Sequence, residues 1–467
     1  MQYHKIYRLL FLFSLTNKKA YHINMNILKK HKTQFYTCLF IGLIFLYTGS
    51  GYLSWLYHLM DYYDAFSTDL LSEVIGYLFQ ALGVWIFSLL INKNNKHLLS
   101  KESLIYITII DLIFLLLSMI VPNKLLTVLL GYLMNLCHGL LAGYYLTKLS
   151  MIESYKASVF GIGYAIGSIG SYLISLIGDG SFLKDPRIFI IYVIVAFISI
   201  LLNKEDHENI ICTSSDVNHH TLLLASLLVV LLSVVKGTGF YFPAADLSQG
   251  VSLEFTRVFY AIGLILAGIL SDKNRNYGAI ACLCALIFPF LMLFLIREAV
   301  ASSIVWIIGY IFYGFFIVYR VILFSDLSKD ALYLAPLGLA LGRIGDALGS
   351  LIGMLLTSQQ ICLFVLTTIL FIITVIIFVK YYKQVYETVN EKYNDIDSLC
   401  HKYNISTREK EVLNLVLEGK TNIEISSELY ISENTVKFHM KNLNKKFSVT
   451  SKQELIRKCK HILDVKD

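Results

Sequence analysis

Two helices joined by a short turn are predicted by the stretch Thr421-Asn-Ile-Glu-Ile-Ser-Ser-Glu-Leu-Tyr-Ile-Ser-Glu-Asn-Thr-Val-Lys-Phe-His-Met-Lys441. Thr421 and Glu424 have the spacing of a capping box, in which the hydroxyl caps the first helix and the carboxylate reaches back to the backbone. Ser432 can cap the second helix after a turn of two residues. The stretch therefore predicts a helix-turn-helix.

The second of these helices has two unlike faces. One face carries apolar residues at helical spacing, namely Val436, Met440, Leu443 and Phe447. The opposite face carries the lysines Lys437, Lys441 and Lys445. A stripe of lysines is often only a solvated surface. Behind a buried stripe in a helix-turn-helix, however, it suits a helix that lies in the major groove of DNA.

Two more helices are predicted around this pair. Ser406 and Glu409 form a second capping box, and Gly419 is placed to end the helix that follows it. A fourth helix is predicted from Ser451 to Ile462. The C-terminal part of the chain, residues 404–467, is thus expected to be a domain of four helices.

From Ile405 to Lys458 the sequence resembles the LuxR-type (NarL/FixJ-type) effector domain. The matching residues are Arg408-Glu409, Glu411-Val412-Leu413, Gly419, Asn422, Glu424-Ile425, Leu429, Ile431-Ser432-Glu-Asn-Thr435-Val436-Lys437, His439, Lys446, Val449 and Glu454-Leu455. Departures from the family pattern are Thr407 for a common proline, Ser426 for alanine and Phe447 for leucine.

The resemblance implies a set of DNA contacts. Base edges would be reached by Lys437, Phe438 and Lys441. Phosphates would be contacted by Thr421, Asn434, Thr435 and Lys445. Phosphate contacts set affinity, and base contacts set the choice of sequence. The fourth helix forms the dimer surface in this family, so a homodimer on promoter DNA is expected.

Upstream of this domain the chain is suited to a lipid bilayer. The whole sequence is 56% hydrophobic and 16% charged, against about 25% charged in soluble proteins. Twelve apolar segments are predicted to span a membrane. They are 35–57, 69–91, 103–121, 125–147, 157–177, 187–202, 221–241, 255–271, 277–296, 301–324, 331–357 and 361–381.

The distribution of basic residues predicts the orientation of these spans. With a cytoplasmic amino terminus, the inside loops hold more lysine and arginine than the outside loops, and the first outside loop is acidic. An even number of spans then leaves both termini in the cytoplasm. The expected location is the cytoplasmic membrane of the cell. We expect residues 1–34 to be a cytoplasmic segment, with Met25 as the natural start, and residues 382–403 to be a helical linker.

One loop carries the mark of a transporter family. Gly268-Ile-Leu-Ser-Asp272-Lys273-Asn-Arg275 follows the eighth span and resembles the loop found after spans two and eight of major facilitators. The loop after span two lacks the motif. The longest polar loop, at about 203–219, lies between spans six and seven. We therefore predict an all-α protein whose membrane domain, residues 35–381, is a facilitator-like bundle of two six-helix halves.

Charged residues inside the spans are candidates for ligand binding, because each is costly in a membrane unless it is paired or hydrated. Arg343 and Asp346 can share one helical face, and Arg320 and Asp111 lie in other spans. The functional interpretation is a polar cavity that binds a small molecule. The structural alternative is that Arg343 and Asp346 only lock two helices together.

No motif in the sequence indicates an enzyme, a metal site or a cofactor. The eight cysteines show no metal-ligand spacing beyond the lone Cys282-x-Cys284, which lies in an apolar run. The whole arrangement resembles twelve-span LuxR-type regulators. It predicts a membrane-anchored one-component transcription regulator that senses a small molecule. A facilitator-type transporter with an autoregulatory DNA-binding tail is the alternative.

Overall fold

The computed structural model describes residues 3–92, 96–177, 181–203, 218–241, 256–294, 299–328, 331–387, 396–397, 399–400 and 402–464. By their contacts, residues Lys30–Tyr381 form one compact unit, called here the membrane unit. A second unit comprises Tyr382–Asp467, called here the tail, together with Met1–Lys29. Residues 204–217 of the predicted polar loop and the middle of the predicted linker lie outside the described residues.

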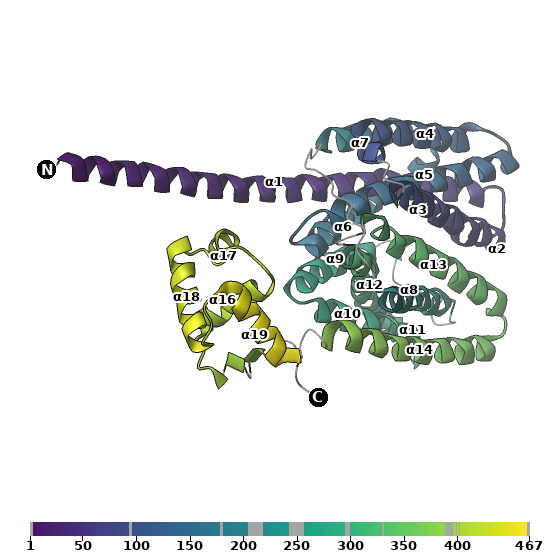
Figure 1. The fold of residues 1–467 in the computed structure, drawn as a ribbon. Coiled ribbons are helices and arrows are strands. Elements are labelled where there is room, and N and C mark those ends of the chain that lie inside the picture. Colours follow the sequence, from purple (N-terminus) through teal and green to yellow (C-terminus); the bar gives the residue numbers. More distant parts are fainter. Residues whose placement is uncertain are drawn as a thin grey trace. The chain divides into compact units, whose positions relative to one another are not determined.

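The described residues form helices joined by turns, with no strand among them (Figure 1). In chain order, the helices up to the middle of the membrane unit are α1 (Tyr3–Met60), α2 (Ala65–Asp69), the π-helix η1 (Leu70–Gly76), α3 (Tyr77–Asn92), α4 (Lys101–Ile120), α5 (Lys124–Ser150), α6 (Lys156–Ser175) and α7 (Ile188–Leu202). The rest of that unit contains α8 (His219–Gly239), α9 (Thr256–Lys273), α10 (Arg275–Ala285), α11 (Phe288–Phe294), α12 (Ala299–Leu327), α13 (Leu337–Leu356) and α14 (Gln360–Tyr382).

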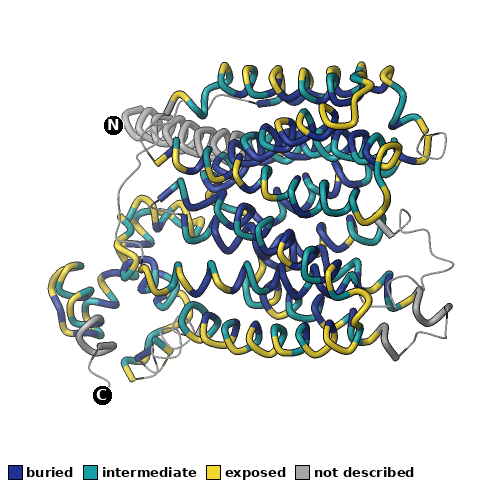
Figure 2. The backbone as a smooth tube through the Cα atoms, turned by 90° about the vertical axis from the view of Figure 1, so that its right-hand side faces the viewer, coloured by how far each residue is buried: buried dark blue, intermediate teal, exposed yellow. Residues whose placement is uncertain are grey.

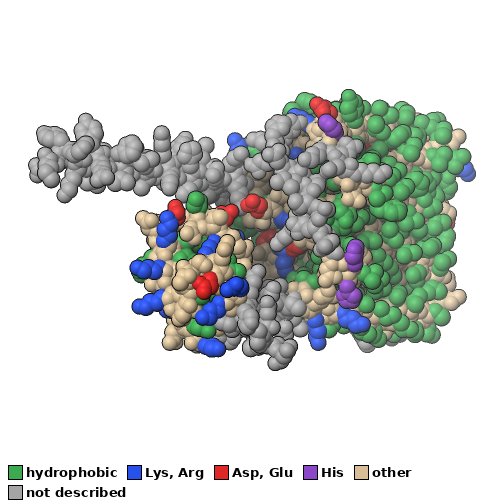
Figure 3. All heavy atoms as spheres, viewed as in Figure 1, with side chains coloured by type: hydrophobic (Ala, Val, Ile, Leu, Met, Phe, Trp, Pro, Cys, Tyr) green, Lys and Arg blue, Asp and Glu red, His purple; other side chains and the backbone are tan. Residues whose placement is uncertain are grey.

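All twelve predicted spans fall on helices. Nine helical segments within the described residues are long and apolar enough to cross a membrane. The other three predicted spans fall on α7, on α9 and on α10 with α11, which are shorter or carry more charge. Large apolar side chains such as Trp85, Ile194 and Ile361 are exposed along the spans. Hydrophobic side chains also cover the right-hand part of the membrane unit in the view of Figure 3, so this unit is suited to lipid.

The membrane unit repeats one packing pattern in its two halves. In the first half, α1 packs on α6 and α3 packs on α5. In the second half, α8 packs on α13 and α9 packs on α12. Four glycines mark equivalent crossings: a Cβ on Gly83 would lie 3.1 Å from the Cα of Gly139, and one on Gly314 would lie 2.8 Å from the Cα of Gly263. Two six-helix halves of a facilitator-like bundle, as predicted, account for this repeat.

The halves meet along two contacts, one between α6 and α9 and the other between α3 and α13. At the first contact the backbones nearly touch, because a Cβ on Gly161 would lie 2.3 Å from the carbonyl oxygen of Leu264. Beside the second, Val74 of η1 packs with Ala347 and Met354 of α13 in a small apolar core. Buried residues concentrate in the interior of the unit, between the helices (Figure 2). Charged groups found there are therefore shielded from bulk water.

The tail has a hydrophobic core of its own, made by four helices as predicted. These are α16 (Thr407–Leu417), α17 (Asn422–Glu428), α18 (Glu433–Lys446) and α19 (Lys452–Asp464). The core residues include Val412, Ile425, Val436, Leu443 and Phe447, all fully buried. The predicted apolar stripe of the second helix of the helix-turn-helix is thus the inner face of α18.

Candidate DNA interface and membrane cavity

Local sequence signals set the ends of the tail helices. Both predicted capping boxes are formed, Ser406 with Glu409 at α16 and Thr421 with Glu424 at α17. Gly419 has a φ of 85°, and this left-handed conformation favours glycine after α16. Tyr430 also has a positive φ, of 55°, in the turn before α18. These signals set where α16 and α17 begin, where α16 ends and where the turn before α18 lies.

Most of the residues expected to contact DNA are exposed on the two helices of the helix-turn-helix. Lys437, Lys441 and Lys445 are exposed on α18, and Phe438 is 60% exposed, which is unusual for a phenylalanine. Thr421 and Asn434 are exposed at the amino-terminal ends of α17 and α18. Thr435 is half-buried, and its hydroxyl lies 2.7 Å from that of Ser432. An exposed aromatic ring among lysines suits the major groove, where a thymine methyl offers an apolar contact.

A buried carboxylate ties α16 to α18. Glu409 is 5% exposed, and its Oε2 accepts hydrogen bonds from the backbone N–H of Ser406 at 2.9 Å and from Lys446 Nζ at 2.5 Å. Burial acts to raise the pKa of Glu409, but the bonds from Lys446 and Ser406 outweigh it and hold the pKa below the ordinary 4.5. The ionised carboxylate is therefore part of the folded domain.

This pairing predicts an acid-sensitive domain. Because the pKa of Glu409 is lower in the folded state than in the unfolded one, its stabilisation is complete above about pH 4.5. It is lost as pH falls through the lowered value. We expect Glu409→Gln to reduce the free energy of unfolding at neutral pH and to flatten its decline in acid, measured by thermal unfolding of a fragment starting at residue 396. Glu411→Gln, on the same helix but more exposed, is the control. Equal behaviour of the two variants would contradict the assignment.

The membrane unit encloses a cavity of about 760 Å³ between its halves, a volume typical of small-molecule sites. Its lining combines charged residues with many aromatic rings. The charged residues are Asp69, Glu73, Lys236, Arg320, Arg343 and Asp346. The tyrosines are Tyr52, Tyr77, Tyr145, Tyr164, Tyr241, Tyr260, Tyr310 and Tyr313.

Three cations surround one carboxylate in this cavity. Asp346 on α13 accepts hydrogen bonds from Arg320 on α12 at 2.9 Å and from Lys236 on α8 at 3.1 Å. Arg343 Nη1 lies farther away, 3.6 Å from the same carboxylate. Asp346 and Arg320 are each 2% exposed as side chains. The predicted pair of Arg343 and Asp346 is thus part of a larger group, in which Arg320 and Lys236 hold the carboxylate and Arg343 is held least.

Asp111, expected at the cavity, is not among the lining residues. It is fully buried on α4, behind His138 on α5, whose Nε2 lies 3.4 Å from its carboxylate. His138 does line the cavity. The sequence shows only that Asp111 is inside a span, and α4 lies against α5 and α7 at the outside of the bundle. Its carboxylate therefore points to a neighbouring helix rather than to the centre.

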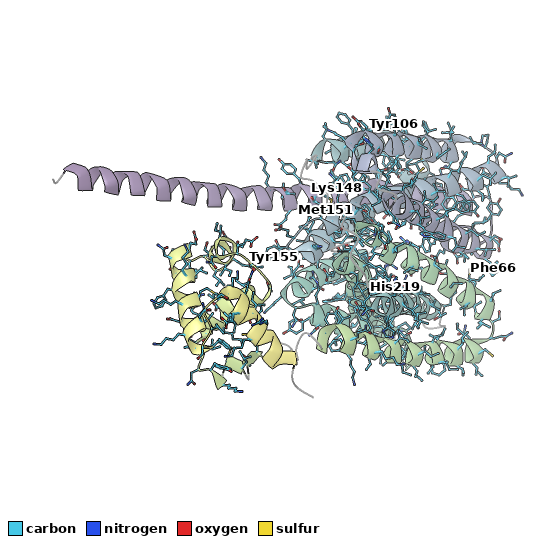
Figure 4. The ribbon with its side chains drawn as sticks, viewed as in Figure 1. Phe66, Tyr106, Lys148, Met151, Tyr155 and His219 are labelled. Carbon is cyan, nitrogen blue, oxygen red and sulfur yellow. The ribbon has the colours of Figure 1, made fainter. Side chains whose placement is uncertain are left out.

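The cavity reaches one end of the membrane unit. Asp69, Tyr241 and Thr357 line it, and each lies within a few residues of a helix end on the side of the α1–α2 connection. Figure 4 labels Phe66 at this end, and Lys148 and Tyr155 at the other. Side chains of α6, α12 and α13 line the depth between the two ends.

At the end marked by Tyr155, the facilitator-type loop joins the two halves. The Asp272 carboxylate accepts hydrogen bonds from the backbone N–H groups of Ala157 and Ser158, at 3.1 and 2.7 Å, and so caps α6. Arg275 donates to Asp272 at 3.0 Å and to Asp326 on α12 at 2.7 Å. Asp272 and Arg275 of this loop thus connect α6, α9 and α12 at this end.

Comparisons with known proteins confirm the resemblance predicted for the tail. Residues 403–459 match the family model described as bacterial regulatory proteins, luxR family. The regulatory protein SdiA of Escherichia coli K12 is 47% identical over 62 residues, which are 13% of this chain and 26% of SdiA. The CsgBAC operon transcriptional regulatory protein of the same organism is 42% identical over 67 residues, 14% of this chain and 29% of that protein. The chain thus covers under a third of these relatives' length.

The membrane unit has a more distant likeness. A crystal structure of a mutant of the nucleoside transporter NupG aligns with 76% of this chain and all of that chain, at 14% sequence identity and a TM-score of 0.46. The protein is therefore described by its two parts: a LuxR-type DNA-binding domain, and an all-helical bundle with the character of a multi-pass membrane protein.

Proposed function

We propose that this protein is a membrane-anchored, one-component transcription regulator. The observation that carries the proposal is the presence, in one chain, of a LuxR-type domain with an exposed basic helix and a polar cavity inside a membrane unit. The cavity takes up a small molecule, and the tail binds promoter DNA through α17 and α18. Residues 35–381 act as the sensor, 382–403 as the linker and 404–467 as the DNA-binding domain.

The orientation follows from the excess of basic residues in the inside loops. Both termini lie in the cytoplasm, the protein resides in the cytoplasmic membrane, and the tail meets the chromosome. The end of the cavity near Asp69 then faces outward. Confinement of the tail to a thin layer beneath the membrane raises its local concentration, which favours a homodimer through α19. A ligand controls the tail only as far as it binds two states of the membrane unit with different affinity.

Transport with an autoregulatory tail is the second candidate, and one observation favours it. The network of Asp272, Arg275 and Asp326 joins the halves at one end, while the cavity reaches the other end. That geometry suits alternating access. In the proposed regulator the same two states report the ligand without net flux.

Genome-wide DNA occupancy of the full-length, membrane-inserted protein tests the proposal. We expect one or a few promoters to be occupied and their occupancy to change when the membrane unit binds its ligand. Uptake of the same ligand into liposomes containing the protein separates the two candidates, because a pure sensor binds without accumulating it. Flux together with promoter occupancy would favour the transporter with a tail, and a complete lack of specific occupancy would contradict both.

A further inference from the structure

One side of the cavity carries carboxylates that make no ion pair with the three cations around Asp346. Asp69 and Glu73 both line it, four residues apart where α2 passes into η1. Glu73 accepts a hydrogen bond from the Ser350 hydroxyl at 3.2 Å. Among the described residues, no lysine, arginine or histidine nitrogen comes within 4.0 Å of either carboxylate. Two carboxylates therefore face the cavity without a cation in contact.

The segment that carries them is itself unusual. Leu70–Gly76 is a π-helix inside an otherwise α-helical span. π-helical turns are rare, and those that interrupt an α-helix are frequently found at functional sites. Here it brings Asp69 and Glu73 toward the cavity while Ser72 and Val74 are buried.

The basic side presents one cation in particular. Arg343 is the most loosely held of the three, at 3.6 Å from Asp346 Oδ2. Its Nε is buried and has no hydrogen-bond partner within the described part of the chain. Its guanidinium lies 4.4 Å from the ring centroid of Tyr77, a cation–π contact that fixes its position. Arg343 can therefore donate hydrogen bonds to a carboxylate or phosphate in a fixed orientation.

With His138 counted as neutral, the formal charges of the cavity add up to zero. Lys236, Arg320 and Arg343 are three cations, and Asp69, Glu73 and Asp346 are three anions. A ligand with a net charge would leave one charge uncompensated in a poorly hydrated site, which costs several kcal/mol. A ligand with one charge of each sign keeps the balance. The aromatic rings between the two sides favour an ammonium group and an apolar body.

We propose, on the basis of the sensor function above, that the ligand is a zwitterion of the size of a short peptide. Its ammonium group binds between Asp69 and Glu73. Its carboxylate binds Arg343, and the tyrosines enclose the part in between. Asp346, Arg320 and Lys236 hold the basic side in place through their bonds to one another, and Arg343 makes the contact with the ligand.

The test uses the full-length protein in lipid nanodiscs and four matched peptides. These are L-phenylalanyl-L-phenylalanine with free ends, its N-acetyl form, its C-terminal amide, and the form blocked at both ends. Binding is measured by calorimetry at pH 7. We expect the free peptide to bind at least about tenfold more tightly than each singly charged form, and the fully blocked form to bind most weakly, because each blocked end removes one charged contact.

Two variants assign the ends. Glu73→Gln should weaken binding of the free peptide and of the amide, which carry the ammonium group. It should not weaken binding of the acetyl form, whose single negative charge then balances the cavity. Arg343→Gln should weaken binding of the free peptide and of the acetyl form, which carry the carboxylate, and should not weaken binding of the amide. The proposal is overturned if a singly charged form binds as tightly as the free peptide, or if none of the four binds. Promoter occupancy, measured on the same protein, separates that failure from a failure of the regulator function. The wild-type series is decisive even where a variant does not fold.

Discussion

Replacement of Lys437 and Lys441 by alanine is expected to abolish promoter occupancy by the full-length protein. Both side chains are exposed on α18, on the face opposite the core. Loss of two base contacts costs roughly 2–6 kcal/mol, a loss of about 30-fold or more in affinity. Membrane insertion and folding should not change, because both lysines are exposed and the ion pair of Lys437 with Glu433, at 3.0 Å, lies at the surface. An exposed pair of this kind contributes about 0.3–0.5 kcal/mol.

The matched control removes the same charge elsewhere in the tail. Lys402 and Lys410 lie before and within α16, outside the helix-turn-helix. Their double replacement by alanine lowers the net charge by the same amount, so it should weaken nonspecific binding to a similar degree but keep the pattern of occupied promoters. Occupancy maps of the two double variants are the measurement. Identical maps, or unchanged occupancy by the Lys437/Lys441 variant, would refute the placement of α18 in the major groove.

The tail could be predicted from sequence because its signals are local. A capping box involves residues three apart, and a buried stripe repeats within one helix. Ser406, Thr421 and Ser432 therefore identify helix starts without knowledge of the fold. The role of Lys446 was less evident. It belongs to the family pattern, but its bond to Glu409 joins residues 37 apart and depends on how α16 and α18 pack.

The spans could also be predicted, because length and hydropathy are local too. The contents of the cavity could not. Lys236 and Asp346 are 110 residues apart, and Glu73 and Ser350 are 277 residues apart. Nothing in either neighbourhood indicates the partner. In the sequence, Lys236 and Glu73 look like residues near span ends that could reach the membrane surface. The packing of α13 against α8 and η1 instead brings them inside.

A repeat could have served as a further signal. Gly83 and Gly139 in the first half correspond to Gly263 and Gly314 in the second, each pair at a crossing where two backbones touch. In a membrane, close approach of helices depends on such small residues. Glycine spacing compared between the halves would therefore have indicated α3–α5 and α9–α12 as equivalent pairs. The π-helix at Leu70–Gly76 is indicated by no local pattern of this kind in the sequence.

The second large effect is expected from Asp346→Asn. The substitution keeps the shape of the side chain but removes the charge that Arg320 and Lys236 share. Arg320 is 2% exposed, so a poorly hydrated cation without its counter-ion remains inside the bundle. Breaking a buried ion pair from one side costs about 3–5 kcal/mol. We expect a marked fall in the thermal stability of the detergent-solubilised protein and a lower yield of the folded form.

Two comparisons give this result its meaning. Asp61→Asn also removes an ion-paired carboxylate, the partner of Lys184, but both groups are well exposed and such a pair contributes only about 0–1 kcal/mol. Arg320→Met combined with Asp346→Leu removes both buried charges of the closest pair and should restore part of the stability lost in Asp346→Asn. If Asp346→Asn is as stable as Asp61→Asn, the carboxylate does not hold the cations in the folded protein. The basic side of the cavity would then have to be organised by its aromatic neighbours, of which Phe316 and Tyr77 already contact Arg320 and Arg343.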